Sequence, residues 1–256
     1  MKDDPTLKDQ LVAISREAGA AILNVYSRDF QAAHKADRSP VTEADTAAEA
    51  LILEALAHLA PGIPVVAEEE CASNGVPANA PERFFLVDPL DGTKEFIAKN
   101  GEFTVNIALI ENGCPVLGVV YLPAFDACYT GAAGLAERLV GDDHPERIIA
   151  RPAPTEGLVM AISRSHADGE IARAKQRGLN VAGTIVAGSS LKFCRLAEGA
   201  ADLYPRFGTT MEWDTAAGQA VLEAAGGTVE TVDGAPLRYG KAGFQNPHFI
   251  AYGRRG

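Results

Sequence analysis

The chain is poor in cysteine, and its four cysteines are far apart. They are Cys71, Cys114, Cys128 and Cys194, and no two of them form a CxxC pair. This spacing excludes a zinc knuckle and a thioredoxin-type redox site, and four cysteines are too few for a disulfide-rich scaffold. We therefore interpret them as separate thiols in a reducing compartment.

Long apolar runs are absent as well. No run of about 18 apolar residues occurs, so the sequence predicts no transmembrane segment. The chain begins with MKDDPTLKDQ, which has acids where a secretory signal has basic residues. We therefore predict a cytoplasmic protein, and no segment predicts peripheral association with the inner membrane.

Basic residues are scarce relative to acids. Lysine and arginine number 23 against 34 aspartates and glutamates, which gives a formal net charge of −11. Such a chain is a poor ligand for nucleic-acid polymers or anionic membranes by charge alone. An apolar content of 47% argues against disorder, and 256 residues suffice for one large domain or two small ones.

Apolar residues recur at helical spacing near the start of the chain. One stripe runs through residues 7–25, and a second helix begins at Thr42, with Asp45 placed as in a capping box. Short β-branched and aromatic runs then predict strands over residues 64–67, 83–87, 103–110, 116–122 and 128–130.

Residues 131–154, rich in glycine, alanine and aspartate, are predicted to link two halves, 1–140 and 141–256. In the second half strands alternate with helices. The predicted strands are residues 158–162, 184–187, 201–204, 228–232 and 249–252, and the predicted helices are residues 168–177, 189–198 and 213–225. We predict an α+β or layered α/β fold, with the active site between the halves of one compact unit.

The strongest chemical signal is DPLDGT, which begins at Asp88 directly after an apolar strand. Asp88 and Asp91 stand on a tight turn, so their carboxylates can converge, and Mg²⁺ prefers such oxygen ligands. Gly92 permits a close backbone approach, and Thr93 begins a short helix whose free N–H groups suit a phosphate. A polar turn with an N-cap aspartate is the alternative interpretation.

Further acids stand at comparable places. Glu68, Glu69 and Glu70 also follow a predicted strand, although such a run is typical of a solvated loop too. Asp214, in WDTAAG, and Asp45 each stand at a helix start, where an aspartate also acts as a cap. Carboxylates gathered in a cleft repel one another unless a cation is present. Together they indicate a site for two or three metal ions, of the kind used for in-line phosphoryl displacement.

The order and separation of these motifs resemble the inositol monophosphatase-like superfamily. The matching features are an acid before a helix, a Glu-Glu pair, DP[IL]DGT and WDxAAG, and they cover nearly the whole chain. The resemblance implies the αβαβα sandwich of inositol monophosphatase and fructose-1,6-bisphosphatase. It also implies a lithium-sensitive phosphomonoesterase that depends on two or three Mg²⁺ ions.

Further segments are similar to the bacterial 3′(2′),5′-bisphosphate nucleotidases. They are SPVT at 39–42, KEF at 94–96, NGEFTVN at 100–106, SRSH at 163–166, GSSLKFC at 188–194 and LYPRFG at 203–208. That family converts adenosine 3′,5′-bisphosphate and water into AMP and phosphate, a step that serves sulfate assimilation. The resemblance therefore implies a small nucleotide as the substrate.

The resemblance also assigns metal ligands. Glu68 would bind the first metal ion, and Asp88 would bridge metals, with the carbonyl of Leu90 as a further ligand. Asp91 and Asp214 would hold the second metal ion. Three consecutive glutamates leave the register open; we favour the first, because it directly follows the strand and lies 20 residues before Asp88.

The groups that act on the substrate follow from the same resemblance. Thr93, hydrogen-bonded to Asp45, would help to deprotonate the attacking water, and Glu68 would belong to the same catalytic group. The amides of Gly92 and Thr93 would hold the phosphate. The substrate would also meet proposed metal ligands, namely Glu68, Leu90, Asp91 and Asp214.

The remainder of the nucleotide would lie against the second half. Lys192 and Arg206 could hold the 5′-phosphate. Four residues would line the nucleotide pocket: Ser163, His166, Ser189 and Ser190. Ordinary structural interpretations also exist, with Ser189 as a helix N-cap, Lys192 as an exposed helix lysine and His166 as a surface histidine.

Two other functions fit the same motifs. An inositol monophosphatase or a fructose-1,6-bisphosphatase would share the metal ligands, but cations away from the metals, at Lys192 and Arg206, favour the nucleotidase. A non-catalytic regulator that binds a nucleotide or a metal need not keep a water-activating pair such as Asp45 and Thr93. The sequence does not indicate an oligomeric state.

Overall fold

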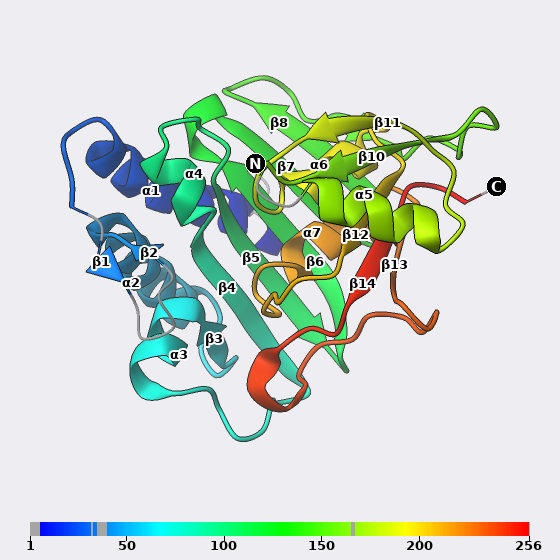
Figure 1. Ribbon diagram of the computed structural model, residues 1–256. Helices are drawn as coiled ribbons and strands as arrows, with labels where there is room; N and C mark the ends of the chain where they lie inside the picture. The colour runs from blue at the N-terminus through cyan, green and yellow to red at the C-terminus, as the bar shows by residue number, and fades with distance from the viewer. Residues whose placement is uncertain (1–5, 32, 35–39, 165–166, 256) are drawn as a thin grey trace.

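Two large β-sheets and three layers of helices, with a small two-stranded sheet beside them, make up the described part of the chain (Figure 1). The computed structural model describes residues 6–31, 33–34, 40–164 and 167–255. The layers contain, in order, α1 (Leu7–Tyr26) with α2 (Glu43–Leu59), the first sheet, α6 (Leu191–Ala197) with α7 (Ala216–Ala224), the second sheet, and α5 (Ala167–Gln176). This arrangement confirms the αβαβα sandwich.

The first sheet has seven strands, in the order in which they occur in the chain. They are β3 (Val65–Ala67), β4 (Arg83–Asp91), β5 (Thr104–Glu111), β6 (Cys114–Leu122), β7 (Ala127–Ala132), β8 (Leu135–Val140) and β9 (Glu146–Ile148). Neighbouring strands are antiparallel except β3 and β4, which are parallel. That parallel pair brings the carboxyl ends of two strands to one edge of the sheet.

The second sheet has five strands in the order β11-β10-β12-β14-β13. They are β10 (Leu158–Ile162), β11 (Val181–Val186), β12 (Leu203–Arg206), β13 (Thr228–Thr231) and β14 (Phe249–Tyr252). Short elements complete the fold: β1 (Ala33–His34), β2 (Pro40–Val41), α3 (Glu68–Asn74), α4 (Thr93–Ile97) and the 3₁₀ turns η1 (Pro123–Phe125) and η2 (Ala242–Phe244).

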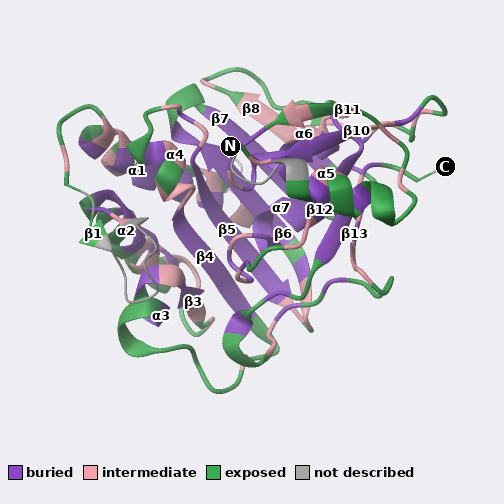
Figure 2. Cartoon of the chain, in the orientation of Figure 1, coloured by how far each residue is buried: buried purple, intermediate pink, exposed green. Residues whose placement is uncertain are grey.

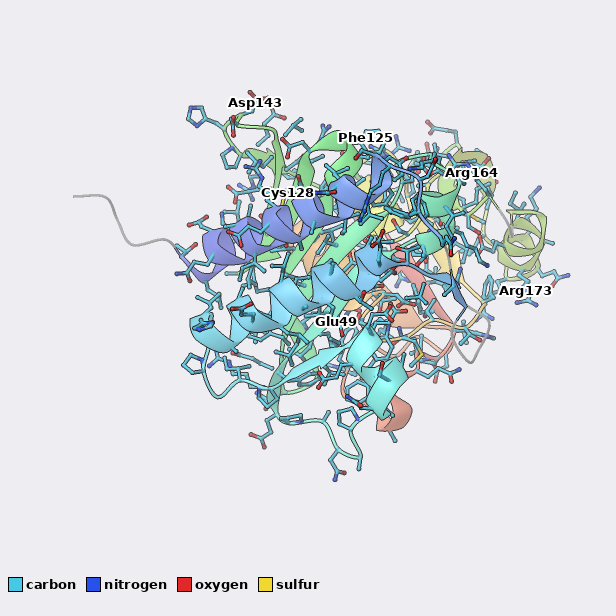
Figure 3. The ribbon with its side chains drawn as sticks, turned by 90° about the vertical axis from the view of Figure 1, so that its left-hand side faces the viewer. Glu49, Phe125, Cys128, Asp143, Arg164 and Arg173 are labelled. Carbon is cyan, nitrogen blue, oxygen red and sulfur yellow. The ribbon has the colours of Figure 1, made fainter. Side chains whose placement is uncertain are left out.

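Capping boxes begin both long helices of the first layer. Thr6 and Asp9 form one at α1, and Thr42 and Asp45 form the other at α2. In each box the threonine side chain and the acid satisfy N–H groups that the first helical turn leaves unpaired. The two helices lie side by side across the sheet, as Figure 3 shows from their outer face.

Strand β4 is buried from Phe84 to Leu90 (Figure 2). Its run RFFLV has no polar alternation, which is what a strand with both faces covered requires. Phe85 packs in the core under α1 and α2, whereas Phe84 and Leu86 face the core that surrounds α6 and α7. Apolar side chains on both faces thus fix β4, the strand that ends in DPLDGT.

The prediction that residues 131–154 form a link was wrong for the first part of that stretch. β7 extends to Ala132, and β8 and β9 continue the first sheet. Ala133 and Gly134, both with positive φ, make the tight turn that joins β7 to β8. β9 is the edge strand and carries the exposed charges Glu146 and Arg147, and β8 beside it holds the half-buried charges Glu137 and Arg138, so their apolar pattern was weak.

Other boundaries differ less. The predicted division after residue 140 falls between β8 and β9, which pair with each other in the first sheet, and the two-half organisation stays a prediction. α7 begins at Ala216, three residues later than predicted, so Asp214 stands in the preceding turn. The glutamate run belongs to the helix α3 rather than to a solvated loop.

The structure also bears on the sequence predictions about transmembrane segments and cysteines. No helix among the described residues is long and apolar enough to cross a bilayer. The four cysteines are free thiols, three of them buried.

The helix α7 lies directly on the backbone of the first sheet. A Cβ atom added at Gly118 of β6 would lie 2.4 Å from the carbonyl oxygen of Ala217, and one added at Gly131 of β7 would lie 2.4 Å from the Cα of Val221. Real Cβ atoms do not come that close to backbone atoms, so both positions require glycine.

We expect Gly131→Ala to lower the free energy of unfolding by about 1–3 kcal/mol, because the methyl group forces α7 away from the sheet. Gly183→Ala in β11 is the matched control, since the nearest atom to its Cβ would be Val159 Cγ2, at an ordinary contact distance of 3.9 Å. Urea unfolding of both variants measures the difference. Equal stabilities would contradict the close packing of α7.

Candidate active site

The parallel pairing of β3 and β4 brings two acids together. Ala67 is paired with Val87, so the next residues along the chain, Glu68 at the start of α3 and Asp88 in β4, lie side by side. Asp214 approaches from the turn before α7. Carboxylate oxygens of Glu68, Asp88 and Asp214 lie within 4.8 Å of one another. Three of the five sequence-predicted acids therefore converge, without Asp45 and Asp91, and of the three glutamates it is the first that joins the group.

The DPLDGT turn is fixed by its own backbone. The N–H of Leu90 donates to Asp88 Oδ1 over 3.0 Å, and the ladder between β4 and β5 is interrupted between Asp88 and Asp91. Such a bulge redirects side chains at the end of a strand. Gly92 follows with φ of 92°, a conformation that favours glycine.

Asp91 connects this turn to the second half of the chain. Its Oδ2 accepts the N–H of Ser190 over 2.7 Å. Burial raises the pKa of Asp91 to about 6; the Lys192 ammonium opposes this shift, and the charges of Glu95 and Glu68 add to it. Burial, followed by repulsion from Asp91 and Glu68, raises the pKa of Asp214 well above its ordinary value.

These shifts show that nearby cations only partly offset the burial and mutual repulsion of the acids. Buried carboxylates this close cannot all be ionised at low cost in the absence of a cation. Their hard oxygen atoms suit a divalent cation such as Mg²⁺. Glu68, Asp88 and Asp214 therefore fit a divalent metal site by both geometry and donor chemistry.

Asp45 has two roles. Its Oδ2 accepts the N–H and the hydroxyl of Thr42, both over 2.8 Å, which completes the capping box. Its Oδ1 accepts the hydroxyl of Thr93 over 3.3 Å. The predicted contact between Asp45 and Thr93 is therefore present, and the cap interpretation is correct as well.

Glu49 is a buried residue of the site that sequence reasoning missed. It lies one turn after Asp45 on α2, and its carboxylate accepts the N–H groups of Glu69 and Glu70 over 2.8 and 2.7 Å (Figure 3). It thereby caps α3, whose own N-cap residue has no side-chain cap bond. The four-residue spacing from Asp45 was the available signal, because both side chains share one helix face.

A pocket extends from the acids towards the second half. Its walls include Asp91, Gly92, Ser163, Gly188, Ser189, Lys192, Tyr204, Arg206 and Asp214. Lys192 is buried, contrary to its interpretation as an exposed lysine, and its ammonium donates to the carbonyls of Ser189 and Ala187 over 2.8 and 3.3 Å. Burial lowers its pKa, and Asp91 opposes that shift.

Arg206 lies on the same wall of the pocket. One terminal nitrogen of its guanidinium donates to the carbonyl of Thr209 over 3.0 Å, while its buried Nε has no hydrogen-bond partner among the described residues. A buried donor of this kind is costly unless it finds an acceptor. Arg206 therefore has hydrogen-bonding capacity left for an anion.

The predicted serines differ in position. Ser163 and Ser189 line the pocket. The hydroxyl of Ser190 instead lies 2.7 Å from Asn106 Oδ1, and Ser190, not Ser189, is the N-cap residue of α6. Substrate contacts of these serines stay predictions, and His166 lies outside the described residues.

Comparison with known proteins agrees with this geometry. The model of the inositol monophosphatase family matches residues 3–250, and the chain belongs to that family. A protein of Shigella flexneri named 3′(2′),5′-bisphosphate nucleotidase CysQ is 48% identical over 244 residues, which are 94% of this chain and 97% of that one. Its namesake from Escherichia coli K12 is 47% identical with the same coverage.

Solved structures share the fold. CysQ from Bacteroides thetaiotaomicron superposes with a TM-score of 0.78 at 38% identity, covering 96% of this chain and 97% of that one. An inositol monophosphatase from Thermotoga maritima has a TM-score of 0.76 at 24% identity, covering 95% and 91% of the two chains. The second likeness concerns the fold alone. Divalent metal dependence follows from the family together with the acidic cluster.

Asp214→Asn removes one of the converging charges. We expect the metal-free variant to melt at a higher temperature than the wild type, by about 2–4 °C for each kcal/mol of repulsion relieved. Millimolar Mg²⁺ should raise the Tm of the variant less than that of the wild type, because a ligand is lost. Asp143→Asn, at an exposed loop position, is the control (Figure 3). Identical melting of the two variants would contradict the metal site.

Proposed function

We propose that this protein is a metal-dependent 3′(2′),5′-bisphosphate nucleotidase that converts adenosine 3′,5′-bisphosphate and water into AMP and phosphate. One observation carries the proposal: a single pocket is lined both by carboxylates, Asp91 and the cluster member Asp214, and by the cations Lys192 and Arg206. A substrate with two separated phosphates fits such a pocket. The names of the relatives that match almost the whole chain support the same substrate.

The acids of the pocket and of the neighbouring cluster would hold the metal. Glu68, Asp88 and Asp214 would supply carboxylate oxygens, and Asp91 and the carbonyl of Leu90 complete the proposed set. We propose two or three Mg²⁺ ions, in line with the oxygen donors. When bound, Mg²⁺ lowers the pKa of a water and neutralises phosphate charge.

We assign the removal of a proton from the attacking water to Thr93 and Asp45. The Thr93 hydroxyl donates to Asp45 Oδ1, so its lone pairs are available to accept a proton from water. Asp45 is held by Thr42 at the start of α2 and can take the proton that Thr93 passes on. Glu68 would share in orienting the water. This is general base catalysis by a pre-positioned pair.

Phosphate oxygens would be held at the DPLDGT turn. The amides of Gly92 and Thr93 lie at the start of α4, next to Asp91. No side chain intervenes at Gly92, which lines the pocket. The hydroxide attacks phosphorus opposite the 3′-oxygen, which leaves as the 3′-hydroxyl of AMP.

The second phosphate would be bound by Lys192 and Arg206. The Lys192 ammonium is fixed by two carbonyls, and the Arg206 Nε has no acceptor among the described residues. Charge-assisted hydrogen bonds from both side chains would stabilise an anion bound beside them in the pocket. Inositol 1-phosphate has no group to fill that position.

The direct test offers the purified protein, with Mg²⁺, three substrates in parallel: adenosine 3′,5′-bisphosphate, inositol 1-phosphate and fructose 1,6-bisphosphate. We expect kcat/KM, from released phosphate, to be at least tenfold higher for the nucleotide, about 1.4 kcal/mol of discrimination. Preference for either sugar-type substrate would overturn the proposal. Absence of all turnover with nucleotide binding retained would indicate a regulator instead.

Thr93→Ala tests the proton acceptor. We expect kcat to fall by about 100-fold or more, because the water loses its relay to Asp45. The Mg²⁺ concentration for half-maximal activity should change little, since no proposed metal ligand is altered. Thr46→Ala is the control: Thr46 is exposed on α2, and its hydroxyl donates only to the carbonyl of Glu43. Equal kcat values for the two variants would remove Thr93 from the mechanism.

A further inference from the structure

Glu102 connects segments on both sides of the pocket. It precedes β5, and its side chain is 17% exposed. We propose that Glu102 is a positioning residue that sets the distance between the two phosphate sites and thereby selects a bisphosphate. The inference rests on the proposed function, because Lys192 is taken as a ligand of the second phosphate.

The carboxylate of Glu102 binds two segments of the second half. Its Oε2 accepts the N–H of Gly188 over 2.9 Å and a guanidinium nitrogen of Arg164 over 2.6 Å. Its Oε1 accepts the other terminal nitrogen of Arg164 over 3.0 Å. Arg164 directly follows Ser163, a residue of the pocket wall. The bidentate pair therefore anchors one wall of the pocket to the first half.

The backbone of Glu102 holds the turn that leads into α6. Its carbonyl accepts the Ser189 hydroxyl over 3.0 Å. Ser189 has φ of 43°, in the left-handed region that a residue with a side chain rarely adopts. A Cβ atom at Gly188 would lie 2.8 Å from the Glu102 carbonyl oxygen. The turn is therefore pressed against Glu102 and held there in a strained conformation, as is common at functional sites.

That turn determines where the Lys192 ammonium lies. Lys192 donates to the carbonyls of Ala187 and Ser189, the residues on either side of Gly188. Any shift of Gly188 moves both acceptors and the ammonium with them. Glu102 thus controls the cation of the second phosphate site through backbone contacts, without being a ligand itself.

The same backbone also abuts the first phosphate site. A Cβ atom at Gly92 would lie 3.3 Å from the Glu102 carbonyl oxygen and 3.3 Å from Ser189 Cβ. Gly92 belongs to the turn whose amides are assigned to the reacting phosphate. Glu102 consequently stands between the two phosphate sites and contacts the turn of each. For this reason we assign to Glu102 the role of setting the distance between the two sites.

The inference makes a prediction opposite to simple electrostatics. Removing a negative charge near the pocket would by itself attract an anionic substrate and lower KM. If Glu102 positions the turn, Glu102→Gln must instead raise KM, because glutamine cannot accept from Gly188 and Arg164 as the carboxylate does.

The experiment compares adenosine 3′,5′-bisphosphate with adenosine 3′-monophosphate, which lacks only the second phosphate. We expect Glu102→Gln and Glu102→Ala to raise KM for the bisphosphate about fivefold and tenfold or more. The effect on the monophosphate should be at least fivefold smaller, and the half-saturating Mg²⁺ concentration should stay within twofold of the wild type. Arg164→Ala should have a smaller effect, because the Gly188 and Ser189 bonds remain.

Glu230→Gln is the matched control. Glu230 accepts a bidentate pair from Arg255, over 2.9 Å twice, but lies on β13 and is not part of the pocket lining. We expect it to leave both KM values unchanged. If Glu102→Ala proves unstable by thermal melting, Glu102→Gln and Arg164→Ala still give the KM ratio.

Two failures are distinguishable. If the wild-type enzyme does not prefer the bisphosphate over the monophosphate, the proposed function of Lys192 and Arg206 is wrong. If the wild type shows the preference but Glu102→Gln lowers KM or leaves the ratio of the two KM values unchanged, the positioning role of Glu102 is overturned.

Discussion

Repulsion between carboxylates held close together is the constraint on which the pocket depends. Glu68, Asp88 and Asp214 bring oxygen atoms within 4.8 Å of one another, an arrangement that folding alone does not favour. Backbone N–H groups hold three of the acids in place: Leu90 donates to Asp88, Ser190 to Asp91 and Met211 to Asp214. The fold thus opposes the repulsion with hydrogen bonds from rigid segments. Such a cluster lowers the free energy of unfolding of the metal-free protein, which is the cost of keeping a metal site.

The net charge of −11 describes the molecule less well than the positions of its charges. The pocket is lined by acids and by cations, and Asp91 and Lys192 influence each other's pKa. A divalent cation bound by the acids therefore changes the electrostatic field over the whole pocket. A negative net charge is therefore compatible with the doubly phosphorylated substrate that we propose.

What the sequence predicted was mostly local. The capping box at Thr42 and Asp45 and the buried strand before DPLDGT follow from spacing within single segments, whereas the convergence of the acids was expected from the order of several motifs and from the resemblance. Glu49 and Glu102 escaped prediction because their partners lie about 20 and 60–90 positions away, joined only by tertiary structure. β8 and the edge strand β9 were missed because charged residues interrupt their apolar pattern. The roles of individual pocket residues depend on such distant contacts, which periodicity does not encode.

The one parallel pair of the first sheet has a further consequence. Because β3 and β4 run in the same direction, the chain must return from Glu68 to the opposite edge before β4 begins. α3 and residues 75–82, all exposed except Ala80, make that return, and the latter lie at the end of the sheet remote from the acids (Figures 1 and 2). Insertions there lengthen a surface connection without altering the register of Ala67 and Val87. The fold therefore offers a place for added domains or labels that is mechanically separate from its chemistry.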